Sequence, residues 1–274
     1  MHIVDVVTAA GTIALAAEGS AFHPPSMKDF FPPAIWFEGT PFEVNRIVLI
    51  RFLAIGLLLG FFALVIRKLA VVPSRGQSVA EMLLDFVRVN IVEESMGKEK
   101  AKRFLPLITT IFFLVLSLNL MGFIPGINMA GTATIAVPLL LALIVYVTYH
   151  AAGVQAQGLG HYVKNQIVLP GVPWPLHIIL IPIEFLTKFV IQPATLTLRL
   201  TINMMVGHLL LVLCFAATWF FFFDASVGFK AFGFLTLFGG IFMTLLKTLV
   251  AFLQAYIFAL LASIYINQAM AEEH

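Results

Sequence analysis

Long apolar runs separated by short polar segments dominate the chain. An α-helix needs about 20 apolar residues to cross about 30 Å of hydrocarbon. The pattern predicts an all-α, polytopic membrane protein with about five transmembrane segments, over about 47–67, 104–124, 133–151, 174–223 and 231–269. The run 174–223 is too long for one helix perpendicular to the membrane. It is either two spans or one long, strongly tilted helix.

Two segments of the chain lack this pattern. Residues 1–44 hold clustered prolines, scattered charges and no helical period, so we interpret them as an extramembrane N-terminal arm that precedes a membrane domain over 45–274. Residues 78–97 alternate apolar and charged positions at helical spacing, which indicates a surface amphipathic helix ending near Gly97. Ser78 and Glu81 have the spacing of a capping box at its start.

Composition supports a membrane protein and narrows its chemistry. The chain is 61% hydrophobic and 11% charged, whereas soluble domains contain about 25% charged residues. The net charge of +2 gives no reason to expect nucleic acid as a partner. The single cysteine, Cys214, allows no disulfide within the chain. The sequence contains no phosphate-binding loop, metal cluster or nucleophilic triad, so we expect no cofactor and no catalysis by the chain alone.

Basic residues predict the orientation in the membrane, because loops rich in lysine and arginine stay cytoplasmic. The stretch 67–103 is strongly basic, 125–132 has no lysine or arginine, and 224–230 has only Lys230. We therefore expect the N-terminus outside the cell inner (plasma) membrane. Five crossings then place the C-terminus in the cytoplasm.

A stripe of polar residues lies within the fourth run. Successive spacings of four, four, three, four and four place its members on one face of a regular helix, and they are Glu184, Lys188, Gln192, Thr195, Arg199 and Asn203. A charge at mid-membrane costs at least about 2.5–3.5 kcal/mol and usually lines a pathway. Arg199 cannot escape this cost by deprotonating, so we predict a functional role for it.

The other stripe members have structural alternatives. Gln192, Thr195 and Asn203 are each about as well explained by hydrogen bonds to neighbouring helices. Glu184 and Lys188 lie nearer the predicted cytoplasmic end, where an i,i+4 ion pair at the interface is an equal explanation.

Polar residues in other positions are further candidates. Lys247 and Gln254 are seven residues apart and share a face of the last helix. Asn119 stands among apolar residues of the second span, where a single asparagine more often joins helices than relays protons. His208 follows Arg199 by nine residues, on the opposite face of a regular helix. A histidine can pass protons near neutral pH, although a hydrogen-bonded histidine in the bundle is the alternative.

Three motifs together resemble a known family. The stretch 193–208 resembles the signature of the a subunit of F-type ATP synthases, in which a proline lies six residues before an arginine and an asparagine four after it. That signature also has a titratable residue nine after the arginine. The stretches 253–258 and 119–121 resemble two further signatures. The resemblance to the bacterial type of this subunit covers about 45–270, in order.

The resemblance implies a proton-translocating stator subunit. Its last two segments would be long tilted helices against a ring of c subunits, with Arg199 facing the ring's carboxylates. Asn203, His208, Asn119 and Gln254 would belong to an outer half-channel, with Lys247 nearby in the sequence pattern. A possible cytoplasmic-side path contains Glu184, Lys188, Gln192 and Thr195. The implied partners are the c-subunit ring, b-type subunits of the peripheral stalk, the rest of the ATP synthase and membrane lipid.

The sequence departs from the family pattern at three outer positions. His208 stands where many relatives have glutamate, Lys247 where they often have histidine or glutamate, and Gly122 where they often have aspartate. Either His208 with water relays the proton, or an acid such as Glu43 or Asp224 takes part.

Two other classes of membrane protein are alternatives. A secondary transporter could use Arg199 to bind an anionic substrate, but it predicts inverted repeats that are not evident. A purely structural subunit of a respiratory complex would not explain the polar stripe.

Overall fold

The computed structural model describes residues 34–36, 43–67, 75–124, 129–167, 174–224 and 227–271. Most of the predicted arm 1–44 therefore lies outside the described residues. Its described part contains strand β1 (Ala34–Trp36), which pairs antiparallel with β2 (Val44–Asn45). Within the described ranges these two short strands form the single sheet.

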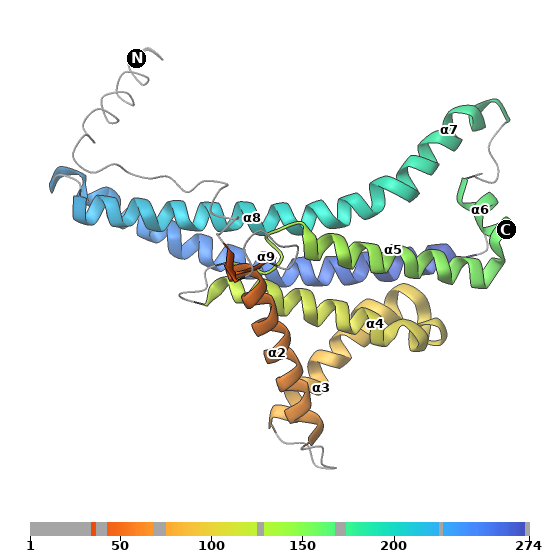
Figure 1. The fold of residues 1–274 in the computed structure, drawn as a ribbon, viewed down its shortest axis with the longest axis horizontal. Helices are drawn as coiled ribbons and strands as arrows, with labels where there is room; N and C mark the ends of the chain where they lie inside the picture. Colours follow the sequence, from red (N-terminus) through yellow and green to blue (C-terminus); the bar gives the residue numbers. More distant parts are fainter. Residues whose placement is uncertain are drawn as a thin grey trace. The chain divides into compact units, whose positions relative to one another are not determined.

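Helices make up the rest of the described fold (Figure 1). The first seven described helical elements are α2 (Arg46–Arg67), α3 (Arg75–Val87), the π-helical turn η2 (Arg88–Glu93), α4 (Glu94–Leu120), the 3₁₀ turn η3 (Met121–Phe123), α5 (Ala136–Gln157) and α6 (Leu159–Ile167). The later elements are α7 (Trp174–Leu186), η4 (Thr187–Ile191), α8 (Gln192–Trp219), η5 (Phe220–Asp224), η6 (Val227–Phe229) and α9 (Lys230–Met270).

Five of the described helical segments are long and apolar enough to cross a membrane: Arg46–Arg67, Arg75–Phe123, Ala136–Gln157, Leu176–Phe223 and Lys230–Met270. The prediction of an all-α polytopic membrane protein is therefore confirmed. Of the two interpretations of 174–223, the structure has one continuous helical segment. A helix of 41 residues, the length of α9, is about 60 Å long, so it fits about 30 Å of hydrocarbon only when tilted or curved.

The predicted amphipathic segment differs from the structure at its start. α3 begins at Arg75, so Ser78 lies inside the helix and the capping-box prediction is wrong. The physical reason is that Glu81 is already engaged within the helix, where its Oε1 accepts a 2.8 Å hydrogen bond from Nε2 of Gln77. The helical run then continues through η2 into α4, with a break at Gly97. Gly97 has φ 75°, a conformation that favours glycine.

The chain divides into two compact units, and the smaller one has Val206–Lys247 as its described part. Here the end of α8 packs on the start of α9 through small and aromatic residues. A methyl group on Gly233 would lie 3.1 Å from the Phe222 ring, so glycine permits this close approach. The Thr218 hydroxyl also donates a 3.0 Å hydrogen bond to the Thr236 hydroxyl. Such small-residue and hydroxyl contacts are the usual means of joining helices in lipid.

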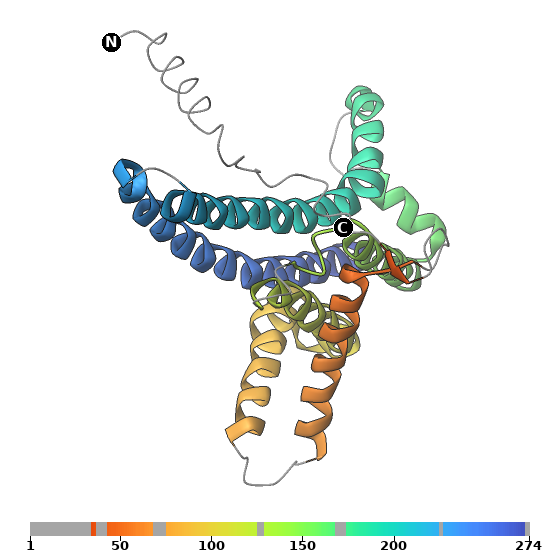
Figure 2. The same cartoon turned by 60° about the vertical axis from the view of Figure 1, so that its left-hand side comes forward.

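The larger unit contains Pro32–Met205 and Thr248–His274. Figures 1 and 2 both show α2 and α3 side by side in this unit. Polar contacts join α4 to the C-terminal part of α9. The Ser95 and Ser263 hydroxyls share a hydrogen bond, and the main-chain carbonyl of Ser95 accepts a 2.9 Å hydrogen bond from Nδ2 of Asn267. The fully buried Phe112 packs edge-on against Phe252 of α9. Polar bonds and aromatic packing therefore hold these helices together.

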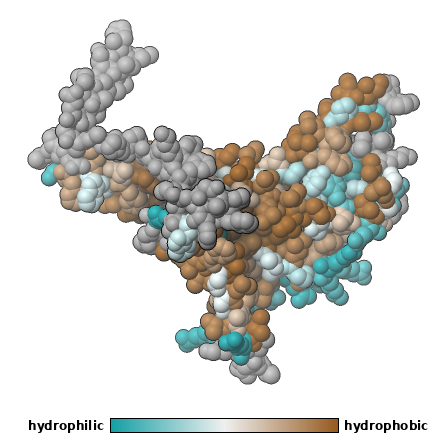
Figure 3. Space-filling model, viewed as in Figure 1, coloured by the Kyte–Doolittle hydropathy of each residue, from teal (hydrophilic) through white to brown (hydrophobic). Residues whose placement is uncertain are grey.

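The surface of the larger unit suits a hydrocarbon environment. Large apolar side chains of α2 are strongly exposed, among them Phe52 at 66% and Leu59 at 64%. Hydrophilic side chains gather instead where α4 begins (Figure 3), over residues 97–103. An exposed apolar surface of this extent indicates contact with lipid or with partner helices.

Gly153 is a glycine that the packing of the larger unit requires. A methyl group there would lie 2.2 Å from Cε2 of Tyr162 and 2.8 Å from the carbonyl oxygen of Ala269. We expect Gly153→Ala to lower the stability of the fold by about 1–3 kcal/mol, because overpacking forces both neighbours to move. Thermal unfolding of the purified protein in detergent measures this change.

Gly160→Ala is the matched control, because a methyl group at Gly160 meets no atom within 4 Å. Equal unfolding temperatures for the two variants would contradict the packing described at Gly153.

Candidate functional site

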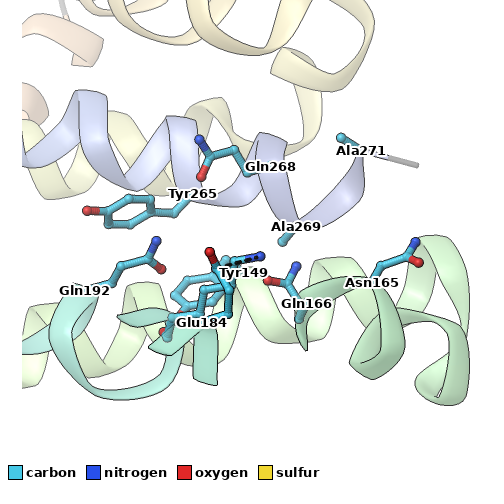
Figure 4. A pocket seen from close by; sticks show the side chains of 10 residues that line it. Tyr149, Asn165, Gln166, Glu184, Gln192, Tyr265, Gln268, Ala269 and Ala271 are labelled. Atoms are coloured by element: carbon cyan, nitrogen blue, oxygen red, sulfur yellow. Dashed lines mark hydrogen bonds and ion pairs between the residues drawn. The ribbon is translucent and has the colours of Figure 1, made fainter. Parts of the chain in front are cut away.

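A polar pocket of about 310 Å³ lies in the larger unit, among α5, α6, α7, η4, α8 and α9. Figure 4 shows Tyr265 and Gln268 of α9 on one side and Gln192, Glu184 and Tyr149 on the other. Its full lining is Tyr149, Asn165, Gln166, Glu184, Lys188, Gln192, Tyr265, Gln268, Ala269 and Ala271. Hydroxyl, amide and charged groups therefore surround a space that is large enough for several water molecules.

The pocket contains the ion pair that the sequence indicated. Nζ of Lys188 lies 3.6 Å from Oε2 of Glu184, one helical turn away. Both side chains are about a quarter exposed, at 27% and 25%. The Tyr149 hydroxyl donates a 2.9 Å hydrogen bond to the main-chain carbonyl of Lys188. This bond attaches η4 to α5 beside the pocket.

An aromatic cluster on α5 and α6 also packs on η4. The ring of His150 stacks on Phe189, with centroids 4.9 Å apart. His150 Nδ1 and the Tyr162 hydroxyl share a 2.7 Å hydrogen bond. Burial raises the pKa of Tyr162 to about 12, so its hydroxyl keeps its proton at physiological pH. α6 is thereby attached to α5 and, through the His150 ring, to η4.

The π-helical turn η4 changes the predicted stripe. A π-turn has i→i+5 hydrogen bonds, so residues after it are rotated relative to a regular α-helix. Glu184 and Lys188 do line the pocket together with Gln192. Thr195 does not line it, and its hydroxyl bonds back to the Ile191 carbonyl at 2.7 Å. The prediction of one regular α-helical face over all six residues is therefore wrong at η4.

Arg199 lies seven residues beyond Gln192 on α8 and is half-buried, as is Asn203. Two helical turns therefore separate Arg199 from the pocket-lining Gln192 along α8.

Asn119 and Gln254 are both buried in the larger unit, at 0% and 5% exposure. Nδ2 of Asn119 donates a 3.3 Å hydrogen bond to the Ala251 carbonyl, which is three residues before Gln254 on α9. Oδ1 of Asn119 accepts a hydrogen bond from the Thr132 hydroxyl. Asn119 therefore joins α4, the following loop and α9, as expected of an asparagine between helices.

His208 and Lys247 belong to the smaller unit and are buried there, at 6% and 4% exposure. A methyl group on Gly207 would lie 3.6 Å from Cγ of Lys247, so the lysine stem passes beside Gly207 of α8. Glu43, one of the two acids that could replace the usual carboxylate of the outer half-channel, is exposed. The side chain of Asp224 lies outside the described residues.

Several pocket residues lie outside the polar stripe predicted from the sequence, above all Tyr149 and Tyr265. A signal for Tyr265 was present, because it follows Gln254 by eleven residues, which is about three helical turns. The polar face of the last helix thus extends from Gln254 to Tyr265. Tyr149, Asn165 and Gln166 had no such signal, because they reach the pocket from α5 and α6 through tertiary packing.

Fold and site together define the class of protein. The chain is a polytopic helical membrane protein that holds ionisable and hydrogen-bonding groups within its membrane segments, as proteins that conduct ions do. Residues 48–267 match the model of the family described as ATP synthase A chain. The chain belongs to this family, the a subunits of bacterial F-type ATP synthases.

Individual relatives agree with the family match. The chain is 49% identical over 255 residues to ATP synthase subunit a of Rhodococcus erythropolis, covering 92% of each protein. It is 37% identical over 277 residues to ATP synthase subunit a of a Nocardioides species, covering 98% of this chain and all of the relative. It is 35% identical over 264 residues to that of Pseudarthrobacter chlorophenolicus, covering 96% and 99%. The chain is accordingly a multi-pass membrane component of an ATP synthase, and its family translocates protons.

The pocket geometry predicts water access at Gln192. In a Cys214→Ser background, Gln192→Cys should react with a charged thiol reagent at least about tenfold faster than Ile191→Cys, because thiols ionise in water and stay protonated in apolar surroundings. Mass spectrometry of the modified protein measures both rates. Ile191 is the matched control, since it is adjacent, 46% exposed and outside the pocket. Equal rates would show that the pocket does not admit water.

Proposed function

We propose that this chain is the proton-translocating stator subunit of a rotary ATP synthase, with two aqueous half-channels and Arg199 facing the carboxylates of a c-subunit ring. The observation that carries the proposal is the position of Arg199 within an apolar helix, half-buried and two helical turns beyond the pocket-lining Gln192. A charge that remains accessible on a membrane helix is suited to a partner that brings the opposite charge.

The role of Arg199 follows from electrostatics. A nearby cation favours the ionised form of a carboxylate, so a c-subunit carboxylate would release its proton as it passes the guanidinium. The same fixed charge repels a proton moving directly between the half-channels. Net proton flow then requires rotation of the ring. Each charge supplies about 2.3 kcal/mol per 100 mV, so several protons are needed for one ATP.

The polar pocket is the proposed cytoplasmic half-channel. Its Glu184–Lys188 pair, Gln192 and Tyr265 provide donors and acceptors that can order water between the pocket mouth and Arg199. Thr195 is closer to Arg199 along α8 and remains a candidate for the inner end of this path.

The outer half-channel is proposed to include Asn119, Asn203, Gln254, His208 and Lys247. Asn119 and Gln254 are both buried, and Asn119 bonds to α9 three residues before Gln254. His208 and Lys247 are also buried, and the Lys247 stem passes beside Gly207. We propose His208 with water as the relay, because imidazole accepts and donates protons near neutral pH.

The proposed orientation and partners follow from surface chemistry. The basic stretch 67–103 faces the cytoplasm, with the N-terminus outside and the C-terminus inside the plasma membrane. The c-subunit ring packs on the face that carries Arg199, while b-type stalk subunits and lipid cover other apolar faces, such as the exposed leucines of α2.

Replacing the arginine tests this mechanism. Arg199→Ala should abolish ATP-driven proton pumping while the complex still assembles, because the variant removes a charge from a half-buried position rather than from the fully buried core. Acidification of inverted membrane vesicles, normalised to assembled complex, measures pumping. Arg67→Ala is the control, since Arg67 ends α2 and is exposed. Normal pumping by Arg199→Ala would falsify the mechanism.

A second variant tests the proposed relay. His208→Ala should slow pumping most where imidazole titrates, over about pH 6–9, because the remaining water path lacks a group that changes protonation in this range. The measurement is vesicle acidification as a function of pH. Unchanged pumping over that range would remove His208 from the path and leave the role of Arg199 intact.

A further inference from the structure

Arg51 is a charged residue within the first membrane-spanning helix that the sequence analysis passed over. It lies five residues after the start of α2 and is half-buried. Its Nε donates a 3.0 Å hydrogen bond to the Gly131 carbonyl, and its Nη2 donates a hydrogen bond to the Thr134 hydroxyl. Arg51 therefore binds two acceptors on the loop between η3 and α5.

This loop is built tightly into the larger unit. Ala130 and Thr132 are both at 0% exposure. The Gly131 amide donates a 3.0 Å hydrogen bond to the Leu118 carbonyl at the end of α4. A methyl group on Gly131 would lie 2.7 Å from a Leu118 methyl carbon and 3.3 Å from Cγ of Arg51. The guanidinium stem, the loop and α4 are thus in direct contact.

The contacts continue from the loop to α9. The Thr132 hydroxyl donates to Oδ1 of Asn119, and Nδ2 of the same asparagine donates to the Ala251 carbonyl at 3.3 Å. Because the oxygen of Asn119 is engaged by Thr132, its amide nitrogen is directed at α9. A chain of hydrogen bonds therefore runs from Arg51 through the loop and Asn119 to the turn of α9 that precedes Gln254.

We propose that Arg51 is a positioning residue for Asn119. Through the loop, Arg51 holds the asparagine amide in the orientation that the outer half-channel uses. This inference rests on the proposed function. Arginine suits the task because its planar group binds two acceptors at fixed angles and never loses its charge. If the loop moved away, the guanidinium would be left without its two acceptors in a membrane segment, which is costly.

The experiment uses the assembled ATP synthase and two readouts. Hydrogen–deuterium exchange of residues 129–135 reports the position of the loop independently of transport. The rate of ATP synthesis per assembled complex, driven by acidification on the outer side in proteoliposomes, reports the proton path. The variants are Arg51→Gln, Arg51→Lys and Thr132→Val, and the control is Arg67→Gln, which removes a charge from the exposed end of the same helix.

We expect Arg51→Gln to raise exchange at Gly131 and Thr132 and to lower synthesis about tenfold, the change that follows from losing a hydrogen bond to a charged group. Arg51→Lys should restore part of both values, because lysine keeps the charge but cannot bind both acceptors in the same geometry. Arg67→Gln should match the unchanged protein in both measurements.

The double variant Arg51→Gln/Thr132→Val tests whether both residues act through Asn119. Its synthesis rate should be no lower than that of the slower single variant, because residues in one chain of contacts are not additive. Losses that multiply would overturn the proposal. Increased exchange of the loop with an unchanged rate of synthesis would also overturn it. The same holds if exchange of the loop does not change in Arg51→Gln. If Arg51→Gln does not assemble, unchanged exchange in Arg51→Lys has the same meaning.

Failure of this inference is distinguishable from failure of the proposed function. Normal pumping by Arg199→Ala contradicts the rotary mechanism whatever the state of the loop. A wild-type rate for Arg51→Gln, combined with no pumping by Arg199→Ala, removes only the role of Arg51.

Discussion

Hydrocarbon supplies no hydrogen bonds, so each polar group placed in it must be satisfied by the protein or retained for a partner. The described membrane segments follow this constraint closely. Asn119 is fully buried with both ends of its amide bonded, and the hydroxyls of Thr195, Thr197 and Thr201 each bond a carbonyl one turn earlier. Arg199 differs from them, because it stays half-buried and charged. This contrast supports the role proposed for Arg199.

Irregular helix geometry gives the polar groups their positions. The π-helical turn η4 contains Lys188 and lies between Glu184 and Arg199, and Tyr149 and the stacked His150–Phe189 rings hold it against α5. π-turns of this kind often occur at functional sites, because they rotate one part of a helix relative to the next. Here the turn contains Lys188, which lines the pocket, and α8 continues after it as a membrane helix.

The two ends of the proposed path differ in how they are built. The pocket proposed as the cytoplasmic half-channel is lined by polar side chains from α5, α6, α7, η4, α8 and α9. Around Asn119 the polar groups are instead buried and bonded to one another, with Arg51 and the loop after α4 holding them in place.

The sequence alone determined the membrane class and the five segments long enough to cross the membrane, because apolar length is a local property. The cost of a buried charge, also a local property, led to the role proposed for Arg199. The sequence also indicated the Glu184–Lys188 pair, whose spacing lies within one helix. Only the tertiary structure decided that 174–223 is one continuous segment with a π-turn, and that Tyr149, Tyr265 and Arg51 join the polar groups. The physical reason is that these contacts link residues up to 116 positions apart, from Tyr149 to Tyr265, which no helical period relates.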